Sequence, residues 1–178
     1  GQAFDIARIT RAAHAAGAVA GFDLAHAAGN LELALHDAGA DFAAWCTYKY
    51  LNAGPGAIAG AFVHERLGRD TRIPRLSGWW GHDAATRFRM APKFVAQPGA
   101  EGWQLSNPPI LSAAPLLASL RVFQEAGMAR LRAKSIALTA WAVEQLRPLA
   151  PAVTLVTPAD PAARGAQLSL RIEGDADR

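Results

Sequence analysis

An aspartate and a lysine stand at the ends of two apolar segments that follow one another along the chain. Asp23 closes the run AVAGFD (18–23), and Lys49 follows the run ADFAAWCTY (40–48), between two tyrosines. A charged group at the end of a buried strand is unfavourable unless a partner or a ligand satisfies it. A lysine amine is also a nucleophile once partial burial or nearby positive charge favours its neutral form.

Each of these residues, taken singly, has an ordinary explanation. An aspartate such as Asp23 is more often a loop or helix-capping residue, and a lysine such as Lys49 more often extends its charged end into water. The pair is more specific, because a carboxylate for the pyridinium nitrogen and a lysine for the aldehyde together hold pyridoxal 5'-phosphate (PLP). His26 could contact a ligand held by Asp23, although a lone loop histidine is more often a structural hydrogen-bonding residue.

The elements that must position this pair alternate between helix and strand. The apolar spacing predicts a helix over 4–17, strands over 18–23 and 40–48 with a short helix over 31–39 between them, and a third strand over 57–64. A strand–helix–strand unit brings the carboxyl ends of its two parallel strands to one edge of the sheet, where open α/β sheets bind ligands. We therefore expect Asp23 and Lys49 to meet at this edge.

The second half of the chain has a different organisation. Residues 65–107 are rich in Gly, Pro, Trp and Arg without a sustained period, which is typical of a functional or interface segment. Two long helices and two alternating strands are expected after it, at 108–127, 128–150, 152–158 and 166–173. The change in strand type predicts a large domain over 1–127 and the start of a smaller α+β domain over 128–178.

The composition limits the class of protein. Of the 178 residues, 51% are hydrophobic and 19% are charged, which is typical of a globular protein. The net charge of +3 is spread along the chain, which gives little reason to expect nucleic acid or an anionic membrane as partner. The single cysteine, Cys46, excludes an internal disulfide and suits a reducing cytoplasm. The start without Met and the strand-like end before Arg178 predict a segment of a longer protein.

Four motifs, in this order and with similar spacing, resemble the kynureninase family. They are GFDLAHAAGN, DFAAWCTYKYLNAGPGAIAGAFVHE, SGWWGHDAATRFRM and WQLSNPPIL. Kynureninases are PLP enzymes of the aspartate-aminotransferase fold type. The resemblance is strongest over 17–125. It implies an α/β fold that forms part of a PLP-dependent transferase large domain, with three α/β/α layers around a mainly parallel sheet.

The resemblance also implies roles for the residues around Lys49. Lys49 matches the lysine that forms the Schiff base with PLP and then moves protons, and Asp23 matches the carboxylate that pairs with the pyridinium nitrogen. His26 matches a histidine that contacts the cofactor. Tyr48 matches a tyrosine that reaches the cofactor phosphate and serves as a proton donor.

Three further residues match positions that complete the pocket. The resemblance implies that Trp79 and Asn107 reach the cofactor or substrate from the second subunit of a homodimer, and that Ser106 lines the substrate pocket. From the residues alone, Trp79 is more readily an interface or core aromatic, and Asn107 before two prolines is more readily a helix cap. His82, in the same irregular stretch, has no assigned role.

The implied reaction is hydrolysis of the Cβ–Cγ bond of L-kynurenine or 3-hydroxykynurenine, in tryptophan catabolism and NAD biosynthesis. The products are L-alanine and anthranilate or 3-hydroxyanthranilate, the cofactor is PLP, and no metal is expected. A desulfurase-like lyase of the same fold type and a truncated non-catalytic chain are the alternatives, and Tyr48 argues against the first because such lyases more typically carry a histidine there. The family's phosphate-binding loop and its carboxylate-binding arginine do not occur in this sequence, so the chain alone is expected to bind PLP poorly.

Overall fold

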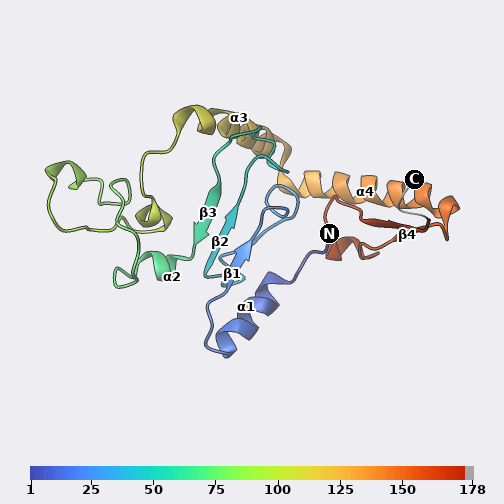
Figure 1. Cartoon of the computed structure of the whole chain (residues 1–178), viewed down its shortest axis with the longest axis horizontal. Coiled ribbons are helices and arrows are strands. Elements are labelled where there is room, and N and C mark those ends of the chain that lie inside the picture. The colour runs from blue at the N-terminus through green and yellow to red at the C-terminus, as the bar shows by residue number, and fades with distance from the viewer. Residues whose placement is uncertain (175–178) are drawn as a thin grey trace.

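The structure is a computed structural model that describes residues 1–174. A small sheet lies at its centre, with α3 above it, α1 below it, and α4 with β4 extending to one side (Figure 1). The elements in chain order are α1 (Ile6–Ala15), β1 (Gly21–Asp23), β2 (Phe42–Trp45), β3 (Gly60–Val63), α2 (Glu65–Gly68), η1 (Arg87–Arg89), η2 (Ala100–Trp103), α3 (Ile110–Ala126), α4 (Met128–Leu146), η3 (Arg147–Leu149), β4 (Val153–Leu155), η4 (Pro161–Ala163) and β5 (Leu170–Ile172). This mixed α/β architecture confirms the predicted fold class.

The central sheet has the strand order β1-β2-β3. β1 and β2 are parallel, with Asp23 opposite Ala44, as the sequence predicts. β3 instead runs antiparallel to β2. The loop between β2 and β3 contains no helix, and an antiparallel pair, unlike a parallel one, needs no crossover connection.

The prediction of a helix over 31–39 is wrong. Residues 35–39 form turns, and the residues before them are largely irregular. The Ala38 N–H donates to the Ala34 carbonyl at 2.9 Å, as in a single helical turn, and Gly39 then adopts a φ of 71°. A single turn gains few hydrogen bonds for the residues it fixes, so a segment this short does not propagate into a helix. The crossover between the parallel strands is therefore made of turns.

The second half follows the sequence more closely. Gly127 ends α3 and begins α4 with a φ of 78°, a conformation that glycine adopts without strain. β4 and β5 form an antiparallel pair inside the two predicted strand segments. The division into domains over 1–127 and 128–178 stays a prediction, and residues 175–178 lie outside the described part. No helix within residues 1–174 is both long and apolar enough to cross a membrane.

The irregular segment 69–107, called the arm below, projects from the sheet on the side opposite to α4 (Figure 1). It is ordered by side chains of its own. The Arg75 guanidinium lies 3.8 Å from the centre of the Trp103 ring. His82 is buried, accepts the Val95 N–H at 3.3 Å through Nδ1, and meets the Phe94 ring edge to face. His82 thus holds two parts of the arm together.

A buried carboxylate holds the amino edge of the sheet. Asp41, which precedes β2, accepts a hydrogen bond from the Ala20 N–H at 2.7 Å and from His14 of α1 at 2.8 Å, and it forms an ion pair with Arg66 of α2. Burial raises the pKa of Asp41, but the Ala20, His14 and Arg66 hydrogen bonds outweigh burial and bring the pKa down to about 2. This network therefore ties two helices to the strands at the edge away from the predicted site.

Candidate functional site

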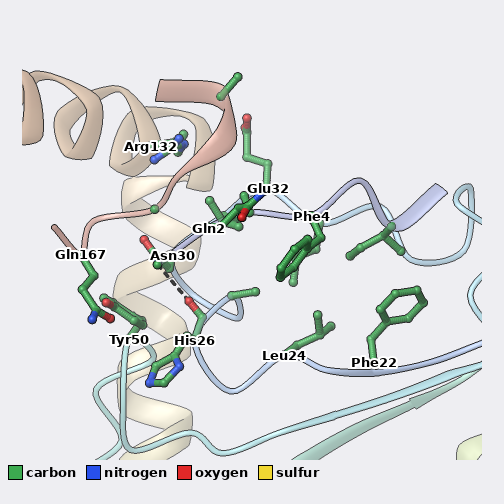
Figure 2. Close-up of a pocket in the computed structure, with 18 of the residues that line it drawn as sticks. Gln2, Phe4, Phe22, Leu24, His26, Asn30, Glu32, Tyr50, Arg132 and Gln167 are labelled. Carbon is green, nitrogen blue, oxygen red and sulfur yellow. Dashed lines mark hydrogen bonds between the residues drawn. The ribbon is translucent and has the colours of Figure 1, made fainter. Parts of the chain in front are cut away.

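A cavity of about 1050 Å³ opens at the carboxyl edge of β1 and β2. Its lining includes Asp23, His26 and Lys49, together with Tyr50. Figure 2 shows His26 and Tyr50 side by side in this cavity, with Asn30 above them. The structure thus brings together three of the residues that the sequence singled out, at the sheet edge where they were expected.

Asp23 is the last residue of β1 and is exposed. Its Oδ1 accepts the Ala25 N–H at 2.8 Å, which fixes the carboxylate against the turn that follows the strand. Within residues 1–174, no hydrogen bond engages its Oδ2. One carboxylate oxygen is therefore used to orient the group, and the other is available to a ligand.

The loop that carries Lys49 is held at several points along its backbone. Thr47 is buried, and its hydroxyl donates to the Ile58 carbonyl, while its own carbonyl accepts the Ala53 N–H at 3.0 Å. Ser119 of α3 donates to the Leu51 carbonyl. Because these bonds lie on both sides of Lys49, the lysine starts from a fixed backbone position and only its side chain is free to move.

The loops that carry Asp23 and Lys49 touch directly. Gly29 has a φ of 79°, and a Cβ added there would lie 2.9 Å from the carbonyl carbon of Tyr50. The His26 and Tyr50 rings meet edge to face, with their centres 6.4 Å apart. The backbones of Gly29 and Tyr50 can approach this closely because glycine has no side chain. Their contact therefore sets the spacing between the loops of Asp23 and Lys49.

The rest of the cavity divides into an apolar and a polar part. Phe4, Phe22 and Leu24 lie on one side of the view, and Arg132 and Gln167 lie on the other with Asn30 (Figure 2). Arg132 comes from α4, and Gln167 precedes β5. The far wall of the cavity thus comes from the C-terminal part of the chain, more than a hundred residues from Asp23 in the sequence.

Four of the residues singled out in the sequence do not line this cavity. Tyr48 is 53% exposed, and the Lys49 ammonium lies 5.9 Å from the centre of its ring. Trp79 lies in the arm, where its indole N–H donates to the Arg87 carbonyl at 3.3 Å. Ser106 and Asn107 are exposed at the end of the arm. Their predicted roles stay predictions.

Sequence reasoning missed Asn30, Tyr50 and Arg132, although all three line the cavity. Asn30 had a weak signal, since it is a polar residue that ends the apolar motif GFDLAHAAGN. Tyr50 was quoted only as a neighbour of Lys49. Arg132 lies on an amphipathic helix among other basic residues, and nothing in its local pattern separates it from a solvated position.

Comparison with known protein families identifies the family of this chain. The aminotransferase class-V family matches residues 1–175. The chain belongs to the aminotransferase class-V family. Within it, the chain is 62% identical over 179 aligned positions to a kynureninase from Stenotrophomonas maltophilia (strain K279a), covering 100% of this chain and 42% of that protein. The chain therefore spans less than half the length of this relative.

Solved structures give the same fold. A cysteine desulfurase from Thermococcus onnurineus NA1, in its apo form, superposes with a TM-score of 0.74 at 22% identity, over 96% of this class-V chain and 40% of that one. A C-DES variant with glycine covalently linked to its PLP cofactor superposes with a TM-score of 0.62 at 23% identity, over 83% of this chain and 36% of that one. At such identities the likeness shows the fold alone, so these two structures assign no reaction to this chain.

Proposed function

We propose that this protein is a kynureninase, which hydrolyses L-kynurenine or 3-hydroxykynurenine to L-alanine and anthranilate or 3-hydroxyanthranilate. The observation that carries the proposal is the 62% identity to a kynureninase along the chain, in a structure whose cavity is lined by Asp23, His26 and Lys49. This reaction belongs to tryptophan catabolism and NAD biosynthesis. We also propose a cytoplasmic location, which the free thiol of Cys46 suits.

The residues that line the cavity fit PLP as the cofactor. The cavity volume of about 1050 Å³ is slightly above the range of roughly 300–1,000 Å³ that is typical of small-molecule sites. The carboxylate of Asp23 has a free oxygen to meet a protonated ring nitrogen, and the amine of Lys49 can meet an aldehyde carbon. PLP, when bound, would supply the electron sink that stabilises negative charge at the substrate Cα.

The side chains of this chain have separate tasks in the proposed reaction. Asp23 keeps the proton on the cofactor nitrogen by charge pairing, and His26 borders the same space. The amine of Lys49 first holds the cofactor, then takes the Cα proton and returns it. Water is consumed: the Cβ–Cγ bond breaks, the hydroxyl goes to Cγ to form the carboxylate of the anthranilate product, and a proton goes to Cβ to form the methyl group of alanine.

We further propose that the active enzyme is a homodimer in which the arm serves the partner subunit. Trp79 and Asn107 lie outside the cavity of their own chain, and Trp79 is 47% exposed. The arm also exposes Leu76, Phe88 and Met90 to 75%, 73% and 77%. Apolar groups of this kind favour a protein contact. Tyr48, exposed beside Lys49, is proposed to meet the cofactor phosphate, and Ser106 is proposed to line the substrate pocket.

The experiment that tests the proposal uses the full-length protein loaded with PLP. Release of anthranilate and alanine in equal amounts from L-kynurenine supports it, and the same assay with 3-hydroxykynurenine ranks the two substrates. Alanine released from cysteine sulfinate, with no product from either kynurenine, would instead assign a desulfurase-like lyase. The variant Lys49→Ala is the matched negative control.

A further inference from the structure

Asn30 joins two parts of the cavity wall that are far apart in the sequence. Its side-chain Nδ2 donates to the His26 carbonyl at 2.9 Å, and its Oδ1 accepts the Ala166 N–H at 2.9 Å. Only 9% of the residue is exposed. A Cβ added at Gly165 would lie 2.3 Å from Nδ2, so the amide is also held by close packing. Figure 2 shows the amide of Asn30 linked to the His26 carbonyl at the cavity wall.

The segment on the C-terminal side of this link is held by hydrogen bonds from two arginine side chains to its backbone. Arg164 is 3% exposed, and its guanidinium donates to the Ala159 carbonyl at 2.6 Å and the Pro158 carbonyl at 3.0 Å. Arg132 of α4 donates to the Arg164 carbonyl at 2.7 Å. Segment 158–166 is therefore tied to α4 by hydrogen bonds, and its Ala166 N–H meets Asn30 at the cavity wall.

The segment on the other side of the link is the loop that follows Asp23. Asn30 fixes the His26 carbonyl, and the His26 ring meets Tyr50, next to Lys49. Gly29 packs on the backbone of Tyr50. A shift of Ala166 would therefore be passed through Asn30 to the loop that sets the spacing between Asp23 and Lys49.

We propose that Asn30 is a positioning residue that couples segment 158–166, and with it α4, to the loop that holds the cofactor. This inference rests on the proposed function, since it assigns Asn30 a role in the same PLP site. Asn30 contacts neither Asp23 nor Lys49 by hydrogen bond within the described residues, and it acts through the backbone of His26. Its removal leaves the His26 carbonyl and the Ala166 N–H, both in part-buried hydrogen bonds, without their partner, which favours displacement of both segments.

The test compares variants of the full-length protein in their affinity for PLP and in amide hydrogen exchange. Asn30→Ala removes both hydrogen bonds, and Asn30→Asp keeps the acceptor for Ala166 but loses the donor to His26. Gln145→Ala removes an exposed amide from α4 and is the control. In Gly165→Ala, the added methyl group meets the side chain of Asn30. In Asn30→Ala this space is vacant, so the double variant is expected to bind PLP no more weakly than Asn30→Ala alone.

The expected result is about a tenfold weaker affinity for PLP in Asn30→Ala, in the fraction that is folded, with Gln145→Ala unchanged. In the cofactor-free protein, Asn30→Ala is expected to speed exchange in the loop after Asp23 and in segment 158–166 together, and Asn30→Asp only in the loop. If Asn30→Ala lowers thermal stability but leaves PLP affinity within twofold, the residue is structural and the proposal fails. Should Asn30→Ala not fold, Asn30→Ser takes its place with the same criteria.

Failure of the proposed function gives a different pattern. If the unmodified full-length protein binds PLP but does not cleave kynurenine, the PLP affinities still decide the role of Asn30. If it does not bind PLP at all, the proposed function fails, and exchange in the cofactor-free variants decides the coupling. Faster exchange in only one of the two segments of Asn30→Ala would then overturn it.

Discussion

Gly29 faces the carbonyl carbon of Tyr50 so closely that a Cβ at position 29 would lie 2.9 Å from it. This contact is where the loop after β1 meets the loop that carries Lys49. The carboxylate of Asp23 and the amine of Lys49 are thus spaced by two backbones in contact. This close contact leaves no room for a side chain at position 29.

Replacing Gly29 by alanine is expected to weaken PLP binding and to lower the free energy of unfolding by about 1–3 kcal/mol. Two effects add, because alanine is strained at a φ of 79° and its methyl group meets the Tyr50 backbone. Urea unfolding and PLP titration of the full-length protein measure the two losses.

Gly17→Ala is the matched control for Gly29→Ala. Gly17 has a φ of 73°, but a Cβ there would meet nothing within 4 Å, so this variant carries the backbone strain without the clash. It is expected to lose stability and to keep its affinity for PLP. Equal PLP affinities for the two variants would contradict the role given to the Gly29–Tyr50 contact.

Asp41 is expected to make the protein sensitive to acid. Its pKa is about 2 in the folded state, against an ordinary value of 3.8. The carboxylate is therefore protonated at a lower pH in the folded state than in the unfolded state. The stabilisation is complete above about pH 5 and is lost as the pH falls through 3.8 toward 2, with a total of about 2 kcal/mol. Urea titrations between pH 6 and pH 3 measure how the unfolding free energy changes with pH. About half of the expected loss falls within this pH range.

The variant Asp41→Asn is expected to be less stable at neutral pH and to show a smaller dependence on pH over the same range. Asp37→Asn, which changes an 85% exposed carboxylate, is the control and is expected to keep the original dependence. An unchanged slope in Asp41→Asn would show that other carboxylates account for the acid sensitivity.

Asn107, at the end of the arm, is proposed to complete the cavity of the partner subunit. If Asn107 serves the partner's cavity, a dimer formed from one Lys49→Ala chain and one Asn107→Ala chain has one site with both defects and one site with none. Co-refolding the two inactive variants is then expected to restore about a quarter of the original activity, since about half of the dimers are mixed and each has one intact site. Mixed dimers that form and stay inactive would place Asn107 in its own chain's site.

The sequence was sufficient to locate the site at one sheet edge. Asp23 and Lys49 could be placed there because parallel strands align their carboxyl ends whatever the crossover contains, so the wrong helix over 31–39 did not change the result. The antiparallel direction of β3 was not foreseen, because the segment 57–64 is apolar in either direction and its sequence does not indicate which way it runs.

The far wall of the cavity could not be predicted in this way. Asn30 meets Ala166 of this wall across 136 residues of sequence, and Arg132 lines the same cavity as Asp23 from a distant helix; such contacts leave no local period or spacing. The Asp41 network has the same character, since His14 and Arg66 meet the carboxylate from two separate helices. Tertiary contacts of this kind become visible only when the chain is folded.

Chemical trapping tests directly whether Lys49 and Asp23 hold PLP as proposed. Borohydride reduction of the full-length protein with PLP, followed by digestion and mass spectrometry, measures which lysine carries the cofactor. We expect a pyridoxyl group on Lys49, with Lys93 and Lys134 unmodified, and weaker labelling in Asp23→Asn. Labelling spread over all three lysines, or retained in Lys49→Ala at the original yield, would contradict it.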